Sequence, residues 1–293
     1  MSIESELNNL IVNILDAYDA VGTKGGTLPT YQNMVNLPSA INSIPVGASF
    51  SGIPKSVVNG EYTSTSDVTE FAIPSDATSV STYLFWYAFY QSSSLTKFDA
   101  HSITTANKGY CFARACESCG NLETIDFSNL ATITSQGSYA FQSAFSSCSK
   151  LSSASFPKLT SVAGQSAFSN AFTNCTGLTS ASFPLLTSIT GSSAFNSAFQ
   201  NCRSLTSVNL TSLATVTSTS ALSYAFRGCT SLTELRFPSL SSVGTNTNQF
   251  NNMLYGVTGC TVHFPSTMQA TIGSWASVTG GFGGTNTTVL FDL

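Results

Sequence analysis

Residues Ala167–Pro184 read AFSNAFTNCTGLTSASFP, and this pattern decides the fold because it returns along the chain at a fixed spacing. Ala-Phe pairs, a cysteine, a leucine and a closing apolar residue recur in the same order before and after this stretch. A fixed period of this kind is typical of a solenoid, in which each unit buries its apolar face only against its neighbours. The leucine that follows the cysteine marks the period, since it occurs every 27 residues, at Leu151, Leu178, Leu205 and Leu232.

Within one unit, the spacing of apolar residues changes from helix-like to strand-like. Counted from Ala167, they occupy positions 0, 1, 4, 5, 8 and 11. At about 100° per residue these positions fall within an arc of about 140°, one face of a short helix. The alternation that follows, at Ala181 and Phe183, is typical of a very short strand, which Pro184 ends because proline has no N–H to donate. Each unit is therefore predicted to hold a short helix, a short strand and a loop.

The same register extends in both directions beyond the clearest copies. Phe71 marks a degenerate first strand, and Val262-x-Phe264-Pro265 repeats Leu235-x-Phe237-Pro238 27 residues later. The chain is therefore predicted to be an α/β repeat solenoid of about eight 27-residue coils, each with a short strand and a short helix. The predicted domains are a helical attachment or oligomerisation segment at 1–45, a linker or small β piece at 46–67, the solenoid at 68–265 and a C-terminal cap at 266–293.

The repeated motif also carries a family resemblance. Leu-x-x-hydrophobic-x-Phe-Pro, preceded by Ala-Phe and Cys-x-x-Leu, resembles the BspA-like leucine-rich repeat of bacterial surface proteins and phage virion proteins. The resemblance covers about Val68–Pro265 and implies a leucine-rich-repeat fold. Because the family serves mainly as a binding scaffold, it also implies a binding role. The repeat is longer here than in the usual pattern, so the family's curvature is not carried over.

The composition favours neutral contacts. Only 8% of residues are charged, the net charge is −4 and the sequence pI is near 5.0, so nucleic acid is not an expected partner. A surface rich in serine, threonine and asparagine suits glycans or other proteins, although it also suits a plain scaffold whose small polar residues stack well. No stretch approaches the ~18 consecutive apolar residues of a membrane span. The acidic opening residues do not resemble a signal peptide, so Sec export is not expected.

Eight cysteines occur, and five of them share one repeat position, which predicts a buried column of small apolar side chains. Neighbouring coils could approach disulfide distance, but free core thiols are the favoured prediction. Cys116 and Cys119 form a lone CxxC, and Cys111 takes an alanine position, so no zinc site, other metal or cofactor is expected. The column consists of Cys119, Cys148, Cys175, Cys202 and Cys229.

Residues 1–21 are predicted to form a helix whose coiled-coil spacing favours a homotrimer or packing on another surface. The alternative is an amphipathic helix that folds back to cap the solenoid. The string from Asp16 to Pro45, DAYDAVGTKGGTLPTYQNMVNLPSAINSIP, resembles the leader of many tailed-phage tail and fibre proteins. That resemblance implies that the N-terminus docks on other virion proteins or trimerises. The heptad positions are Ile3, Leu7, Leu10, Ile14, Ala17 and Val21.

The C-terminal residues are predicted to close the stack, since a last coil would otherwise expose its apolar edge. Met268–Ile272 is predicted to be a last helical turn, Trp275 to cover the open end, and Thr287–Phe291 to form a final strand.

Two outward-facing columns form the candidate binding face. Counting each anchor leucine as one, the third and fifth residues point outward on every predicted strand, and the resemblance implies that binding uses this face. Its middle is bland and its ends are charged. The alternative is a solvated strand face with ion pairs worth at most ~1 kcal/mol. The third-position column is Lys97, Thr124, Ser153, Ser180, Ser207, Glu234 and Thr261, and the fifth-position column is Asp99, Asp126, Ser155, Ser182, Asn209, Arg236 and His263.

An enzyme is not expected, and no catalytic residue is assigned. The two histidines, His101 and His263, lie about six coils apart, and Asp99-x-His101 by itself is neither a metal nor a triad signature. Neighbouring carboxylates at Asp99 and Asp126 would suit glycoside hydrolysis, but an open ridge offers no pocket that excludes water. Ice binding is disfavoured because charged residues interrupt the columns.

Two functions of different classes remain open. The first is a phage virion fibre or spike component, made in the host cytoplasm and trimeric through its N-terminus, which displays the repeats to a host-surface glycan or protein. The alternative is a bacterial BspA-like adhesin or protein-binding module on the cell surface. The leader resemblance and the opening residues favour the first. Neither the ligand nor a tail or head location follows from the sequence.

Overall fold

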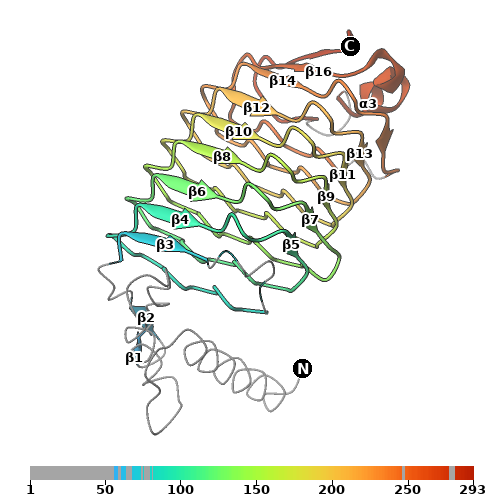
Figure 1. The fold of residues 1–293 in the computed structure, drawn as a ribbon. Coiled ribbons are helices and arrows are strands. Elements are labelled where there is room, and N and C mark those ends of the chain that lie inside the picture. Colours follow the sequence, from blue (N-terminus) through green and yellow to red (C-terminus); the bar gives the residue numbers. More distant parts are fainter. Residues whose placement is uncertain are drawn as a thin grey trace, which may run out of the picture.

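The computed structural model describes residues 56–58, 61–63, 68–73, 75, 80, 82–245, 248–276 and 281–293. Short coils stack on one another in chain order, so that equivalent residues of neighbouring coils lie side by side (Figure 1). A regular coil consists of a three-residue strand, a two-residue strand and a segment of consecutive turns. The solenoid predicted from the 27-residue period is confirmed.

The three-residue strands, here called ridge strands, stack in parallel. Their hydrogen bonds define three sheets, β3-β4-β6, β8-β10-β12 and β14-β16-β17. The central residue of each strand faces the core and its two neighbours face outward, as the alternation predicts. The strands are β3 (Glu70–Ala72), β4 (Lys97–Asp99), β6 (Thr124–Asp126), β8 (Ser153–Ser155), β10 (Ser180–Ser182), β12 (Ser207–Asn209), β14 (Glu234–Arg236), β16 (Thr261–His263) and β17 (Thr288–Leu290).

The two-residue strands form a second parallel sheet, in the order β15-β13-β11-β9-β7-β5. Each strand turns its second residue inward, where Ile189 and Val216 are fully buried. These strands were not predicted from the sequence, because two residues are too few to show an alternation. The strands are β5 (Thr105–Ala106), β7 (Thr132–Ile133), β9 (Ser161–Val162), β11 (Ser188–Ile189), β13 (Thr215–Val216) and β15 (Ser242–Val243).

The segment with the Ala-Phe pairs is not a helix, so that prediction is wrong. Every second N–H along it donates to the next coil, as Phe168 does to the carbonyl of Ala194 (2.7 Å). The N–H groups in between close tight turns within the coil, as Ala171 does onto the carbonyl of Phe168 (3.0 Å). The solenoid is therefore built mostly of strands and turns.

A four-residue repeat of backbone conformation explains why turns form here. Ser166, Asn170 and Asn174 have φ of 50°, 56° and 61°, in the left-handed region that a right-handed helix excludes. A positive φ at the third position of a turn is the signature of a type II turn. Apolar positions 0, 1, 4, 5 and 8 fit a period of four as well as one of 3.6, so the predicted arc did not distinguish the two structures.

Columns of phenylalanine fill the core between the ridge strands, the two-residue strands and the turn segments. Phe112, Phe141 and Phe168 stack with ring centroids 5.0 Å apart at each step. Phe156 and Phe183 stack in the same way at 5.2 Å. All five side chains are buried. Stacked rings stabilise one another beyond the area they bury, which accounts for the same residue type at the same place in successive coils.

The cysteine column is buried and all eight thiols are free, as the sequence predicts. The structure adds a role that the sequence did not indicate. Each thiol of the column donates to a backbone carbonyl of the preceding coil, such as Cys175 Sγ to Phe145 O and Cys202 Sγ to Phe172 O, both 3.0 Å. The carbonyl of Phe172 also accepts the N–H of Cys175 (3.2 Å). Cysteine therefore fills a small apolar site and ties two coils together, which alanine could not do.

The C-terminal residues rejoin the stack. Strand β17 pairs in parallel with β16, Thr288 opposite Thr261, so the predicted final strand is a ninth rung rather than a separate cap strand. Before it, η1 (Ser266–Met268) and α3 (Gln269–Ala276) occupy the part of the coil where earlier coils carry a two-residue strand (Figure 1). The predicted last helical turn is confirmed. The side chain of Trp275 lies outside the described residues.

Residues 1–55 also lie outside the described residues, and with them the predicted heptad helix and the phage-like leader. Within the predicted linker, β1 (Ser56–Val58) pairs with β2 (Glu61–Thr63) in antiparallel fashion, which fits the alternative of a small β piece. The domain boundaries at 45 and 67 stay predictions.

Candidate binding face

Both predicted columns lie on the outer face of the ridge strands, and we call this face the ridge. Within each sheet its side chains are aligned from strand to strand. Strands β3 and β17 extend the ridge by one rung at each end, which the predicted columns did not include. The aligned sets are Lys97 with Thr124, Asp99 with Asp126, Ser153 with Ser180 and Ser207, Ser155 with Ser182 and Asn209, Glu234 with Thr261, and Arg236 with His263.

The middle of the ridge, from β8 to β12, is neutral and rich in hydroxyl groups. Its outward residues are five serines and Asn209, so no charge or aromatic ring projects from it. Threonines beside the ridge are engaged in the stack: Thr179 Oγ1 donates to Ser152 O (3.0 Å) and Thr206 Oγ1 to Thr179 O (3.2 Å). These threonine hydroxyls stabilise the coils, whereas the ridge serines face outward.

Asp99 organises the charged cluster at the N-terminal end of the ridge. Its carboxylate lies 2.6 Å from Nδ1 of His101 and 3.6 Å from Nζ of Lys97, and it accepts the backbone N–H of His101 (3.0 Å). Burial alone would raise the pKa of Asp99, but the hydrogen bonds and charge of His101, with Lys97, outweigh it and hold the pKa below its usual value.

Three of the fifth-position side chains share a structural task. Asp126 accepts the N–H of Ser128 (2.8 Å) and Asn209 that of Thr211 (3.2 Å), as Asp99 does with His101. Each therefore closes a short turn directly after its strand, a common use of Asp and Asn. The predicted neighbourhood of Asp99 and Asp126 is confirmed, but each carboxylate is directed to its own turn, which does not suit a shared acid–base site.

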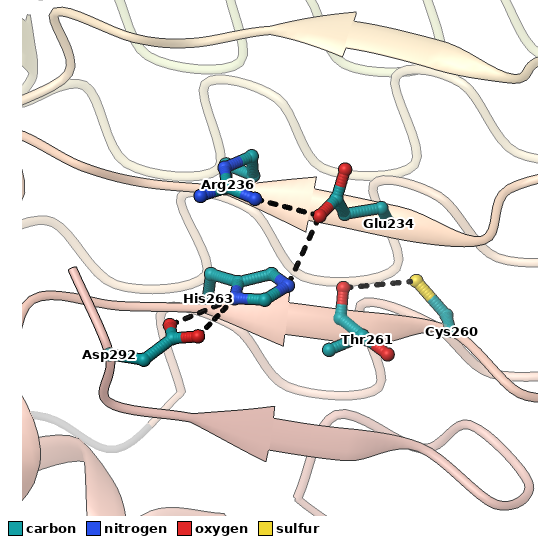
Figure 2. A network of polar contacts seen from close by, with 6 residues as sticks. All are labelled: Glu234, Arg236, Cys260, Thr261, His263 and Asp292. Carbon is teal, nitrogen blue, oxygen red and sulfur yellow. Dashed lines mark hydrogen bonds and ion pairs between the residues drawn. The ribbon is translucent and has the colours of Figure 1, made fainter.

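A second charged cluster at the C-terminal end joins ridge strands β14 and β16 to Asp292, which lies just after β17 (Figure 2). Glu234 Oε1 accepts from Arg236 (2.8 Å) and lies 3.2 Å from Nε2 of His263. On the other side of the ring, Nδ1 of His263 lies 2.8 Å from Oδ1 of Asp292. His263 is only 9% exposed, so its imidazole is held between two carboxylates in a shielded position.

The sequence missed Asp292 as a partner of His263, although a signal for it exists. Asp292 follows the fifth position of β17 by two residues, just as His101 follows Asp99. A side chain two residues after a ridge strand can contact the fifth position of its own strand, as His101 does, or that of the preceding strand, as Asp292 does. The sequence assigns the last strand to the cap, so it does not predict that Asp292, just after that strand, lies beside β16.

Within the described residues, the two clusters consist of carboxylates paired with basic side chains. Among the residues that the structure describes, no group of three His, Cys, Asp or Glu is arranged to hold a metal ion. The second ring nitrogen of His263 faces Glu234 rather than a hydroxyl or thiol nucleophile. What the ridge offers is a row of neutral hydroxyls between two sets of paired charges.

Comparisons with known proteins concern the fold. The family model described as "BspA type Leucine rich repeat region (6 copies)" matches residues 55–197 and 142–269. No curated protein matches the chain. Within the described residues, no helix is long and apolar enough to cross a membrane.

Among solved structures, the leucine-rich-repeat protein TpLRR of T. pallidum is 19% identical, with 76% of this chain and 88% of that chain covered and a TM-score of 0.40. A leucine-rich cell surface protein of Faecalibacterium prausnitzii A2-165 is 14% identical, with 78% and 89% covered and a TM-score of 0.28. A leucine-rich-repeat protein of Bacteroides ovatus ATCC 8483 is 19% identical, with 76% and 84% covered and a TM-score of 0.18. Superpositions this loose carry no further argument.

Proposed function

Because the chain belongs to the family of proteins with BspA-type leucine-rich repeats, we propose that it is a cell-surface binding module without catalytic activity. The ridge is the face that contacts the partner. The partner is a protein, because the ridge is an extended face whose neutral middle carries no aromatic ring that would favour a sugar.

The register of the ridge supports this proposal. Three strands place their serines side by side across β8, β10 and β12, so small hydroxyl side chains leave a large, even surface open to contact. The charged clusters flank this surface, Asp99 with Lys97 at one end and Glu234 with Arg236 at the other. Charges at the rim of a neutral contact area set the orientation of a partner more than they add affinity.

The experiment uses bulky charged substitutions on two equivalent rows of the solenoid. The triple variant Ser153→Arg, Ser180→Arg and Ser207→Arg obstructs the ridge. The control triple variant Ser161→Arg, Ser188→Arg and Thr215→Arg changes the outward row of the second sheet, which is aligned in the same way. Circular dichroism verifies that both variants fold.

Both variants and the unchanged chain are then tested against an array of extracellular proteins. The ridge variant is expected to lose the interaction and the control variant to keep it. Equal binding by both variants, or no bound protein for the unchanged chain, would contradict the proposal.

A second candidate function, a fibre or spike component of a phage virion, is favoured by the leader resemblance of Asp16–Pro45 and by the opening residues, which do not resemble a signal peptide. Its test is the light-scattering mass of the full chain and of a chain that begins near Ser51. A full-length trimer with a monomeric truncation would support assembly through the leader on a particle. Monomers in both cases would oppose trimerisation and favour the surface module.

A further inference from the structure

Three tyrosines form a stack on the outer side of the turn segments in the first coils. The rings of Tyr83 and Tyr110 lie 5.0 Å apart with 14° between their planes, and those of Tyr110 and Tyr139 lie 4.7 Å apart with 10°. Tyr83 is 41% exposed and the other two are half-buried, so the stack belongs to the surface rather than to the phenylalanine core. It lies on the turn side of the coil, away from the ridge strands.

The fold does not require tyrosine at these places. All three residues occupy the first left-handed position of the turn segment, with φ of 60°, 57° and 59°. The same position in the next three coils is held by Ser166, Ser193 and Ser220, with φ of 50°, 54° and 55°. A bulky residue at positive φ is unusual, and strain kept on a surface where serine suffices points to a function.

The stack continues into a wider aromatic surface. Tyr83 contacts the ring of Trp86 at 5.5 Å, and Tyr90 lies further along the same turn segment, 5.2 Å from Tyr87. Half of the ten tyrosines of the chain gather here. The turn segments of the first coils therefore carry a concentration of aromatic side chains, which the serine-rich middle of the ridge lacks.

The polar groups that bond to these tyrosines are neutral, although exposed Lys108 lies two residues before Tyr110 and Arg114 lies 5.2 Å from the ring of Tyr87. Gln165 donates its amide to the hydroxyl of Tyr139 (3.1 Å), and Gln91 donates to that of Tyr90 (3.2 Å). The charges of Arg114 and Glu117 pair with each other at 3.3 Å. A neutral ligand therefore fits better than an ionic one, and phenol and amide groups can both donate to it and accept from it.

We propose that the stack of Tyr83, Tyr110 and Tyr139 is a binding site for a neutral oligosaccharide, separate from the ridge. Because the three rings stack face to face, they present their edges to a ligand, and sugar hydroxyls bond there to the phenol groups and to the amide of Gln165. The steps of 5.0 and 4.7 Å along the stack are close to the length of one pyranose unit in an extended chain. The repeat of the protein thus matches a repeat in the ligand, which a peptide of mixed sequence would not supply.

The test titrates the full chain with neutral hexasaccharides of β-1,4-glucose, β-1,3-glucose, α-1,4-glucose, β-1,4-mannose and β-1,4-N-acetylglucosamine, followed by calorimetry and saturation-transfer NMR. At least one is expected to bind and to receive saturation from the tyrosine rings. The triple variant Tyr83→Ser, Tyr110→Ser and Tyr139→Ser installs the residue that later coils already carry at this position, so the coils are expected to stay folded. Its affinity is expected to fall about tenfold or more.

Tyr255→Ser serves as the control, because this exposed tyrosine lies in a later coil against Arg227. It is expected to leave the affinity unchanged. Binding of none of the five sugars would overturn the proposal, as would equal affinity of the triple variant and the unchanged chain. A peptide or protein that binds in place of sugar and is lost in the triple variant would also overturn it, since the surface would then serve a different class of ligand.

Discussion

His263 and Asp292 are 29 residues apart in the chain, yet Nδ1 of the imidazole lies 2.8 Å from Oδ1 of the carboxylate. The contact joins the eighth ridge strand to the second residue after the ninth. Because β16 is the one strand of the described residues that pairs with β17, this side-chain contact supplements the bond from Thr288 N–H to Cys260 O (3.1 Å). The last rung is thus held by backbone hydrogen bonds and by His263, whose ring lies between the carboxylates of Glu234 and Asp292.

Replacing His263 should lower the local stability of the last rung. His263→Ala removes contacts to both carboxylates and leaves a gap at a position that is 9% exposed. Since both carboxylates are about half exposed, the loss in local stability should be about 1–2 kcal/mol. Hydrogen exchange should show faster exchange of the amides of Thr288–Leu290, while those of β8 and β10 are unchanged. Asp292→Asn, which keeps a neutral acceptor, should have a smaller effect; uniform acceleration along the whole solenoid would argue against a local role.

The Asp99 cluster should contribute a stability that depends on pH. The pKa of Asp99 is lowered in the folded protein, so the stabilisation is present above the unfolded value, near 3.8, and is lost as the pH falls through the lower folded value. Asp99→Asn keeps an acceptor for the His101 N–H but removes the charge. The variant should be less stable than the unchanged chain near neutral pH, by at most about 1 kcal/mol, and equally stable in strong acid. Chemical denaturation at a series of pH values measures the difference in the free energy of unfolding between the two proteins. A difference that grew toward low pH would contradict the prediction.

The cysteine thiols should be unreactive until the protein unfolds. Burial raises the pKa of Cys111 and Cys175 to about 12, so almost no thiolate exists near neutral pH, and thiolate is the reactive form. Iodoacetamide should therefore modify the native chain slowly and the unfolded chain at all eight cysteines. The variant Ser231→Cys places a thiol at an exposed position and should react rapidly, which checks the reagent. Rapid modification of one native cysteine would mean that its coil opens or that its thiol is accessible.

The 27-residue period, the inward and outward residues of each strand, and the register of the ridge could all be predicted, because each follows from repetition and a period of two. The turn segment could not, because Ala167, Phe168, Ala171 and Phe172 occupy one side of a helix and of a four-residue turn repeat alike. The distinction lay in Ser166, Asn170 and Asn174, residue types that tolerate positive φ more readily than β-branched ones. Asp292 and the stacked tyrosines were not predicted because their partners come from other coils, and the contact follows only once the turn segment and the last strand are placed in register with their neighbours.

The turn repeat can be tested at one position. Ser193 has φ of 54° and lies between two coils whose equivalent residues are also left-handed. Ser193→Val places a β-branched side chain in that conformation and should destabilise the protein by about 1–3 kcal/mol. Ser193→Gly removes the steric conflict and should be neutral or slightly stabilising, a reversal of the order expected inside a helix, where glycine is the poorer residue. Ser192→Val, at the exposed neighbouring position, controls for the added apolar side chain. Chemical denaturation gives the order of stability. A glycine variant that is less stable than the valine variant would contradict the turn repeat and support a helix in this segment.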